Sequence, residues 1–387
     1  MTLISFSWLA FMFGVIGLYW ILPSIYRAPF LVLASAGILL YADPRSLLIL
    51  ATICFVTYPL SQIRSHRKLW LALSITGIIG LIAFYKLQAA DSPLDTLRDV
   101  AIPLGMSYYA FRVVHYLLDK YRGALPKHTL RDYVAYLFFA PTLLVGPIHR
   151  FSPFHNNHHH ISWKASDLSE AIERMLIGYF KIVVVGNYLL STYFAGVIGG
   201  INPTNESLVL YLEAVRGSFH LYFLFAGYSD VAIGFALILG YRVMENFNNP
   251  FMKTNIAEFW RSWHISLTSW SRDYIYMTVI GLTRNPYAAT LSSLLVIGIW
   301  HELSLRYVIW GLYHGLGIIA VNKLQKFVRG RRRKRGIKQP PPDSIPVKAL
   351  KIFATANYFF FGYIIISQND LSSAVLIYQK ILFGWWT

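Results

Sequence analysis

The chain has 387 residues, of which 56% are hydrophobic, 16% are aromatic and only 14% are charged, and its mean hydropathy is +0.46. A soluble domain of this size would need more charged surface than this composition supplies. The apolar residues come in long runs and not in strict alternation. The composition therefore favours an all-α, polytopic membrane protein over a β-barrel.

The basic residues give a formal net charge of +17, and most of them flank hydrophobic segments. That pattern sets topology and places cations against anionic lipid headgroups. We therefore expect membrane lipids as partners and no nucleic acid. The single cysteine, Cys54, excludes an intrachain disulfide framework and a thiolate-rich metal site.

Twelve stretches are candidates to enter the membrane, where a span needs roughly 20 apolar residues and a re-entrant helix fewer. The first lacks a basic n-region, so we expect a transmembrane helix and not a cleaved signal. Some others turn back before crossing. We predict a single domain over 1–387 with about 9–11 transmembrane helices plus re-entrant and interfacial helices. The candidate stretches are 4–22, 28–42, 46–62, 69–86, 99–121, 132–148, 176–198, 207–240, 288–300, 304–326, 349–366 and 370–385.

Two loops are clearly basic, RSHRK at 64–68 and RGRRRKR at 329–335. The positive-inside rule places both in the cytoplasm. Three consecutive prolines follow the second loop, so we expect a stiff, exposed linker over 329–346. The weakly charged loops at 89–93 and 200–206 would face outward, and the amino terminus would start outside.

The middle of the chain predicts a long amphipathic helix. Residues 246–255 have turn chemistry, and Asn255 with Glu258 three residues later fits a capping box. One apolar stripe follows at helical spacing: Ile256, Trp260, Trp263, Leu267, Trp270 and Tyr274. A second stripe holds Arg261, His264, Thr268 and Arg272. We expect this helix to lie in the interface or line a cavity, and the alternative is a simple interfacial anchor with a solvated basic face.

A histidine and a glutamate, His301 and Glu302, stand between two apolar runs. Ionisable side chains at membrane depth usually line a cavity, pair with a partner or do chemistry. The alternative is a neutral imidazole satisfied by a backbone carbonyl or a hydroxyl. The pair begins like a zinc-protease HExxH motif, but position 305 is Leu and the motif fails.

Four further histidines cluster in one short stretch: His155, His158, His159 and His160. Such a cluster can bind a metal. No acidic or cysteine partner lies near it in sequence, so we predict a polar loop and no metal site.

Five stretches, taken together and in this order, resemble the membrane-bound O-acyltransferase family, in particular its bacterial branch of alginate O-acetylation and teichoic-acid D-alanylation proteins. Two features depart from the family pattern. Residues 277–286 replace a glycine-rich turn, and Glu302 and Leu303 replace small residues. The matching stretches are PLGMSYYAFRVVHYLLDKYR at 103–122, FFAPTLLVGPIHR at 138–150, GYSDVAIG at 227–234, ENFNNPFMKTNIAEFWRSWHISLTSWSRDYIY at 245–276 and GIWHELSLRYVIWGLYHG at 298–315.

The resemblance implies a site built on two histidines. His301 matches the family's catalytic histidine and His264 the second histidine of the active site. The remaining positions that we expect to bind substrate are Arg261, Trp263, Arg272, Asp273, Asp230 and Trp300. Arg261 or Arg272 would steady the donor, or would only anchor the helix in headgroups. Asp230 would orient an imidazole, or would pair with an arginine, and we expect His314 to be structural.

The resemblance also implies a funnel-like or tunnel-like fold in which donor and acceptor meet. The donor would be a cytoplasmic acyl thioester, acetyl-CoA or an acyl carrier protein, with no permanently bound cofactor. The acceptor would be a hydroxyl of an exported cell-envelope polysaccharide or of a partner acyltransferase, outside the bacterial cytoplasmic membrane. His301 would act as a neutral general base shielded from water, and His264 would orient the acceptor or stabilise the oxyanion.

Three alternatives remain open at this point. The acyl group could be D-alanyl, delivered to a teichoic-acid-like polymer. Broken apolar segments and intramembrane histidines also suit a transporter or channel. A non-catalytic scaffold that recruits an acyltransferase is the third.

Overall fold

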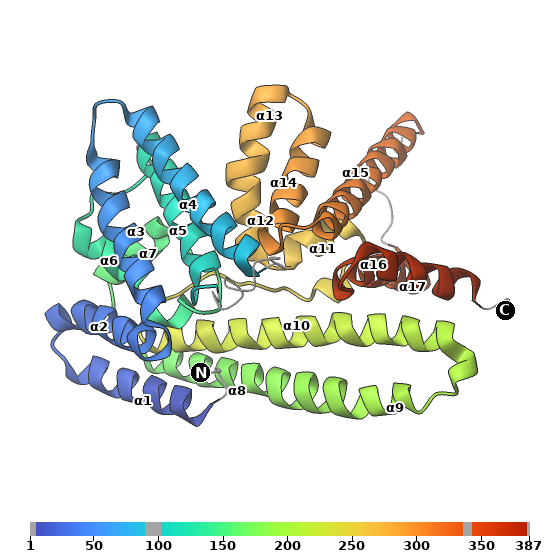
Figure 1. Cartoon of the computed structure of the whole chain (residues 1–387), viewed down its shortest axis with the longest axis horizontal. Helices are drawn as coiled ribbons and strands as arrows, with labels where there is room; N and C mark the ends of the chain where they lie inside the picture. The colour runs from blue at the N-terminus through green and yellow to red at the C-terminus, as the bar shows by residue number, and fades with distance from the viewer. Residues whose placement is uncertain (1–4, 90–101, 336–342, 385–387) are drawn as a thin grey trace. The chain divides into compact units, whose positions relative to one another are not determined.

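The computed structural model describes residues 5–89, 102–335 and 343–384, and within these ranges the chain is helical and contains no strand (Figure 1). It divides into two compact units, each described here by itself. The first comprises the residues up to Phe180 together with Gly227–Glu245. The second comprises Lys181–Ala226 and the chain from Asn246 onwards. The predicted single domain over 1–387 stays a prediction.

The first unit contains the amino-terminal helices and the end of α10. Some of these helices begin at a capping side chain. Asp43 caps α3 and accepts from the N–H of Arg45 at 3.2 Å, and Thr129 caps α6 in a capping box with Asp132. The elements are α1 (Phe6–Ile21), α2 (Ser24–Ala42), α3 (Pro44–Gln62), α4 (Arg67–Ala89), α5 (Met106–Arg122), α6 (Leu130–Leu137), η2 (Ala140–Thr142), α7 (Phe151–His159), α8 (Ala165–Tyr179) and α10 (Glu206–Ile238).

The second unit contains the short helices between α8 and α10, the start of α10 and all helices after α10. Its α14 and α15 pack along each other, which Figure 1 also shows. The elements are η3 (Phe180–Phe194), α9 (Ala195–Gly199), η4 (Pro203–Asn205), η5 (Pro250–Met252), α11 (Ile256–Ser262), α12 (Ile265–Ser271), η6 (Arg272–Tyr276), α13 (Met277–Thr283), α14 (Pro286–His301), α15 (Leu305–Lys334), α16 (Ile345–Ser367) and α17 (Leu371–Phe383).

Six helices among the described residues are long and apolar enough to cross a membrane, which confirms an all-α, polytopic membrane protein. The shorter α1 and α17 are also apolar. The predicted span over 132–148 does not form, because α6 ends at Leu137 and a 3-10 turn follows with prolines at 141 and 147. The count of about 9–11 thus depends on helices shorter than these six and stays a prediction. The six are Ser24–Ala42, Pro44–Gln62, Arg67–Leu87, Ala165–Gly199, Glu206–Ile238 and Ile345–Ser367.

The predicted linker over 329–346 is wrong at both ends. Helix α15 continues to Lys334, with four basic residues in its last turn, where cations complement the helix dipole. Helix α16 already begins at Ile345. The three prolines, like the predicted outward loop at 89–93, lie outside or largely outside the described residues.

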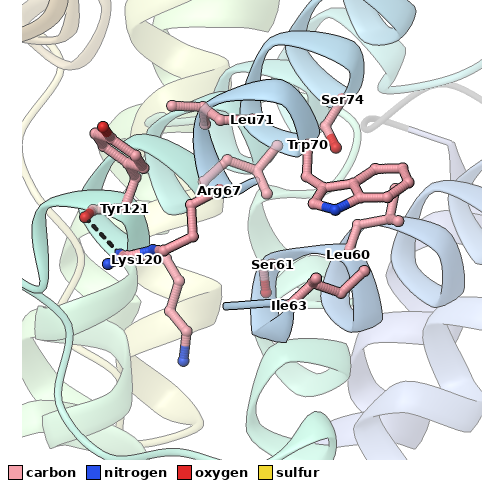
Figure 2. Close-up of a pocket in the computed structure, with 10 residues that line it drawn as sticks. Leu60, Ser61, Ile63, Arg67, Trp70, Leu71, Ser74, Lys120 and Tyr121 are labelled. Atoms are coloured by element: carbon pink, nitrogen blue, oxygen red, sulfur yellow. Dashed lines mark hydrogen bonds between the residues drawn. The ribbon is translucent and has the colours of Figure 1, made fainter. Parts of the chain in front are cut away.

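The basic loop predicted at 64–68 contacts the carboxyl end of α5 through Arg67, the first residue of α4, beside a small pocket that Figure 2 shows. Arg67 donates to the backbone carbonyl of Tyr121 at 2.8 Å, and its guanidinium lies 5.2 Å from the centre of the Tyr121 ring. Lys120 lines the same pocket. Two cations therefore meet at a helix carboxyl terminus, which favours positive charge. The cytoplasmic location of this loop stays a prediction.

Buried polar contacts fix α5, α6 and α7 to one another. His115 lies 3.3 Å from Asp119 through Nδ1, and its Nε2 accepts from the backbone N–H of Phe151 at 3.0 Å. The hydroxyl of Tyr136 lies 3.0 Å from the same Nε2 and donates to the carbonyl of His149 at 2.8 Å. The first turn of α7 is thus anchored through an imidazole that is itself fully buried.

Candidate active site

The helix predicted from Asn255 onwards forms, but it breaks in the middle. Asn255 caps α11 as predicted, accepting from the N–H of Glu258 at 3.0 Å. Trp263 then adopts an extended conformation (φ −105°, ψ 126°) and His264 a left-handed one (φ 45°, ψ 54°) before α12 begins. The prediction of one continuous amphipathic helix is therefore wrong.

Two backbone hydrogen bonds hold this break in place. The N–H of Asn248 donates to the carbonyl of Ser262 at 2.9 Å, and the N–H of Ile265 donates to the carbonyl of Asn246 at 2.8 Å. The preceding loop thus satisfies backbone groups that a continuous helix would have paired internally. A non-glycine residue with left-handed dihedrals carries strain of about 1–3 kcal/mol and persists only where its surroundings impose it. The loop imposes it on His264.

The apolar stripe predicted for this stretch is buried as expected. The residues of the second stripe do not share one environment. Arg261 and Arg272 are exposed, while only 2% of His264 is exposed. The break turns the histidine inward and leaves the arginines outside. The buried stripe consists of Ile256, Trp260, Trp263, Leu267, Trp270 and Tyr274.

One amide side chain fixes which nitrogen of His264 carries hydrogen. The N–H and the hydroxyl of Ser266 donate to Oδ1 of Asn246 at 3.4 and 2.9 Å. These contacts identify the oxygen side of the amide. The same oxygen lies 3.0 Å from Nδ1 of His264. Because a carbonyl oxygen only accepts, Nδ1 carries the hydrogen and the neutral ring keeps its lone pair at Nε2.

The Nε2 atom of His264 is buried and has no hydrogen-bond partner within the described part of the chain. The rings of Phe225 and Trp300 pack around the imidazole, with centroids 4.7 and 6.3 Å away. Burial, with a smaller electrostatic contribution from the neighbouring His301, holds the pKa of His264 well below its usual range. The ring is therefore neutral at neutral pH and can accept a hydrogen bond or a proton.

His301 is the last residue of α14, and its ring also contacts that of Trp300. Their ring centroids are 4.5 Å apart, and the imidazole stacks on Tyr307 of α15 at 5.8 Å. His301 is exposed on the surface of the chain, whereas His264 is buried, and the shielding of His301 from water stays a prediction. Glu302 pairs with Arg306 at 2.6 Å, so its carboxylate has its own cationic partner.

Two glycines allow α14 and α15 to approach closely enough for this stacking. A Cβ atom at Gly298 would collide with the carbonyl oxygen of Tyr307, and one at Gly311 would lie 2.7 Å from the carbonyl oxygen of Leu294. Only glycine permits backbones this close. The position of His301 over Tyr307 thus depends on glycines in both helices.

The other predicted site residues of the second unit lie elsewhere in it. Trp263 is buried in an aromatic cluster, stacked on Phe259 with ring centroids 5.4 Å apart. Arg272 donates to the carboxylate of its neighbour Asp273 at 2.8 Å on the exposed surface. Trp263 therefore contributes to packing, whereas Arg272 and Asp273 lie on the protein surface. His314 is fully buried against Trp260 and Trp310, and its structural role stays a prediction.

Asp230 belongs to the first unit, where an arginine is its partner. Arg174 of α8 donates to its Oδ1 through Nε and Nη2 at 3.2 and 3.1 Å. The same guanidinium also donates to Glu245 at 2.6 Å through Nη1. Of the two interpretations open from the sequence, the arginine pair is the one the structure contains.

The structure thus brings together His264, Trp300 and His301 from the predicted set. It adds Asn246, which sequence reasoning did not single out although it lies inside the recognised stretch 245–276. Asn246 lies in a turn and His264 follows the next helix, and no sequence spacing predicts that two such residues meet. The only sequence feature that pointed to Asn246 was the turn composition of the NFNNP stretch.

The chain is similar to a family of known membrane enzymes. A family model described as MBOAT, membrane-bound O-acyltransferase family, matches residues 45–364. The chain is 29% identical to the probable alginate O-acetylase AlgI of Pseudomonas aeruginosa, over 96% of this chain and 73% of that protein. It is 32% identical to the teichoic acid D-alanyltransferase of Streptococcus thermophilus, over 69% of each.

A peptidoglycan O-acetyltransferase of Helicobacter pylori is 26% identical over 83% of this chain and 66% of that protein. Against the probable alginate O-acetylases of Pseudomonas putida and Pseudomonas fluorescens the chain spans 65% and 61% of their length. The family match covers most of the chain, including both histidines of the candidate site. The chain therefore belongs to the membrane-bound O-acyltransferase family and is an O-acyltransferase.

Proposed function

We propose that this protein moves an acyl group, acetyl in the first place, from a cytoplasmic thioester to a hydroxyl of an exported cell-envelope polysaccharide or of a partner protein. The observation that carries the proposal is the pair of imidazoles that both contact Trp300, one of them buried, neutral and with a free lone pair. Four of the five relatives described are named for O-acetylation, three of alginate and one of peptidoglycan.

The chemistry is a direct transfer without a covalent enzyme intermediate. The acceptor hydroxyl attacks the thioester carbonyl carbon, an ester C–O bond forms and the C–S bond breaks. The hydroxyl proton passes to His301 and from there to the departing thiolate. General-base catalysis of this kind contributes about 10²–10⁴-fold to the rate. The exposed position of His301 at the end of α14 leaves it open to substrate.

The hydrogen bonding of His264 narrows its role. A neutral ring whose Nδ1 donates to Asn246 has only a lone pair at Nε2, so it cannot donate a hydrogen bond to an oxyanion. Orientation of the acceptor fits that ring, because a second hydroxyl of the acceptor glycan can donate to Nε2 while the reacting hydroxyl gives its proton to His301. We therefore prefer this role to oxyanion stabilisation.

The donor in this proposal is acetyl-CoA or an acyl carrier protein, used as a substrate and not held permanently. The protein would lie in the bacterial cytoplasmic (inner) membrane with its donor inside. The glycan or partner acyltransferase would be outside, and the two substrates would meet in a funnel or tunnel. D-alanyl transfer to a teichoic-acid-like polymer is the second candidate, and the similarity to the Streptococcus thermophilus D-alanyltransferase favours it.

Mass spectrometry of envelope glycans from cells with and without the gene tests the proposal. We expect an ester-linked acetyl group that disappears with the gene, and an alanyl mass would select the second candidate. Cells carrying His301→Ala should lack the modification while the protein is still inserted. Continued acylation in that variant would instead support a scaffold, and substrate flux that persists without acyl donor would support a transporter.

A further inference from the structure

We propose that the first unit carries a binding site for a divalent transition metal of the zinc class, formed by Asp132 of α6 with His155 and His159 of α7. One ligand atom from each residue lies within 4.8 Å of the other two. The inference does not depend on the proposed acyl transfer. It corrects the expectation of a simple polar loop, because the fold supplies from α6 the acidic partner that the neighbouring sequence lacks.

The geometry suits a tetrahedral ion. His155 and His159 stand four residues apart on α7 and so share one face of the helix, with ring centroids 4.4 Å apart. Nε2 of His159 lies 3.2 Å from Oδ1 of Asp132. Zinc–nitrogen and zinc–oxygen bonds of about 2.0–2.1 Å give a tetrahedral edge of about 3.3 Å. Two ligand atoms therefore already have the required separation.

The carboxylate is oriented before any ion arrives. The backbone N–H and the hydroxyl of Thr129 both donate to Oδ2 of Asp132, at 2.7 and 2.8 Å. This capping box occupies one oxygen and leaves Oδ1 directed at His159. Hydrogen bonds of this kind hold metal-binding carboxylates in place and raise affinity for the ion.

The neighbouring histidines are engaged elsewhere, so the site has three protein ligands. His158 pairs with the hydroxyl of Tyr241 at 2.8 Å. His128 contacts the Tyr116 hydroxyl and a backbone carbonyl at 2.8 and 2.7 Å. Three ligands leave a fourth position for water or a small anion.

The donor set selects the class of ion. Two imidazoles and one carboxylate suit Zn²⁺ and its transition-metal neighbours, whereas Mg²⁺ and Ca²⁺ prefer oxygen ligands throughout. The site is open to incoming ions, because the side chain of His159 is 49% exposed while that of Asp132 is only 10% exposed. The competing explanation is a plain hydrogen bond between these two side chains without any ion.

The test is Zn²⁺ titration of the full chain, purified in detergent without a histidine tag and stripped with a chelator, against a competing fluorescent zinc indicator. We expect saturable binding of one Zn²⁺ per chain, no comparable binding of Mg²⁺, and a melting temperature that rises with Zn²⁺. His155→Gln and His159→Gln should each weaken Zn²⁺ affinity at least about 10-fold, the lower end of what the loss of a merely orienting partner costs.

His160→Gln is the matched control, because this exposed histidine next to the site bonds its own helix at the carbonyl of Asn156. It should bind Zn²⁺ as the unsubstituted protein does. Asp132 also takes part in the capping box of α6, so Asp132→Asn can destabilise the fold without any effect on zinc. The melting temperature of this variant must therefore be measured without Zn²⁺ as well. The proposal is overturned if the unsubstituted chain shows no saturable Zn²⁺ binding. It is equally overturned if both histidine variants fold and bind Zn²⁺ as tightly as the His160→Gln control.

Discussion

At the scale of single residues, the state of His264 depends on Asn246. The amide oxygen holds Nδ1–H and thereby keeps the lone pair at Nε2. Burial keeps the pKa of the ring well below its usual range, so a neutral ring exists over the whole neutral pH range. The family resemblance identified His264 from the RSWHISL sequence. Its left-handed backbone and its asparagine partner arise from tertiary contacts and could not be read from local sequence.

Asn246→Asp is expected to move the acid limb of the pH–rate profile to higher pH. A carboxylate beside Nδ1 stabilises the imidazolium, so the pKa of His264 rises and the ring loses its lone pair at a higher pH than before. The measurement is turnover against pH for the purified enzyme. In the unsubstituted protein the depressed pKa predicts that protonation of His264 itself causes no loss of turnover above the ordinary histidine value of about 6.5.

His264→Ala and Asn246→Leu serve as the reference variants for that profile. His264→Ala should reduce turnover by about 10²-fold or more, the cost of a poorly positioned acceptor, without loss of membrane insertion. Asn246→Leu should lower turnover and also stability, because it leaves buried polar groups without an acceptor at about 1–3 kcal/mol each. Normal turnover in His264→Ala would remove His264 from the site.

At the scale of elements, the helical spacing of apolar residues predicted correctly which side chains are buried, but not that the helix is interrupted. The stripe from Ile256 to Tyr274 is buried throughout, yet the helix that should carry it is interrupted at Trp263 and His264. Neither residue type breaks helices by itself. The interruption comes from the loop of Asn246 and Asn248, whose backbone groups replace helical partners, so tertiary contacts override local propensity.

Gly311→Ala should destabilise the second unit, although alanine is a better helix former than glycine. Its Cβ would lie 2.7 Å from the carbonyl oxygen of Leu294, and forced contacts in a packed interface cost about 1–3 kcal/mol. Gly330→Ala is the matched control in the same helix, because no atom lies near its Cβ position. That change should leave stability unchanged or raise it by up to about 1 kcal/mol.

Thermal unfolding in detergent, followed by tryptophan fluorescence, measures both variants. The expected result is a lower melting temperature for Gly311→Ala and an equal or higher one for Gly330→Ala. A shift of α14 against α15 would also displace His301 from Tyr307, so turnover should fall in the first variant alone. Equal stabilisation by the two alanines would contradict the close approach of these helices.

At the scale of the whole molecule, composition and apolar runs were sufficient to predict an all-α membrane protein. They could not predict which runs form long helices. The apolar run over 132–148 is short helix and turn, because its residues fill the core of the first unit instead of facing lipid. Asp132 in that run also became the acidic neighbour of His159, a contact between α6 and α7 that no sequence spacing encodes.

The predicted topology can be tested with one cysteine at a time, because the chain has a single native cysteine and that residue, Cys54, is buried. In a Cys54→Ala background, Ser65→Cys reports on the basic loop and Thr204→Cys on the weakly charged loop at 200–206. Both positions are exposed. The positive-inside rule predicts that a membrane-impermeant maleimide labels residue 204 on intact spheroplasts and residue 65 only after permeabilisation. The reverse labelling pattern would invert the assignment of sides, and with it the expectation that the acyl donor reaches the site from the side of the basic loops.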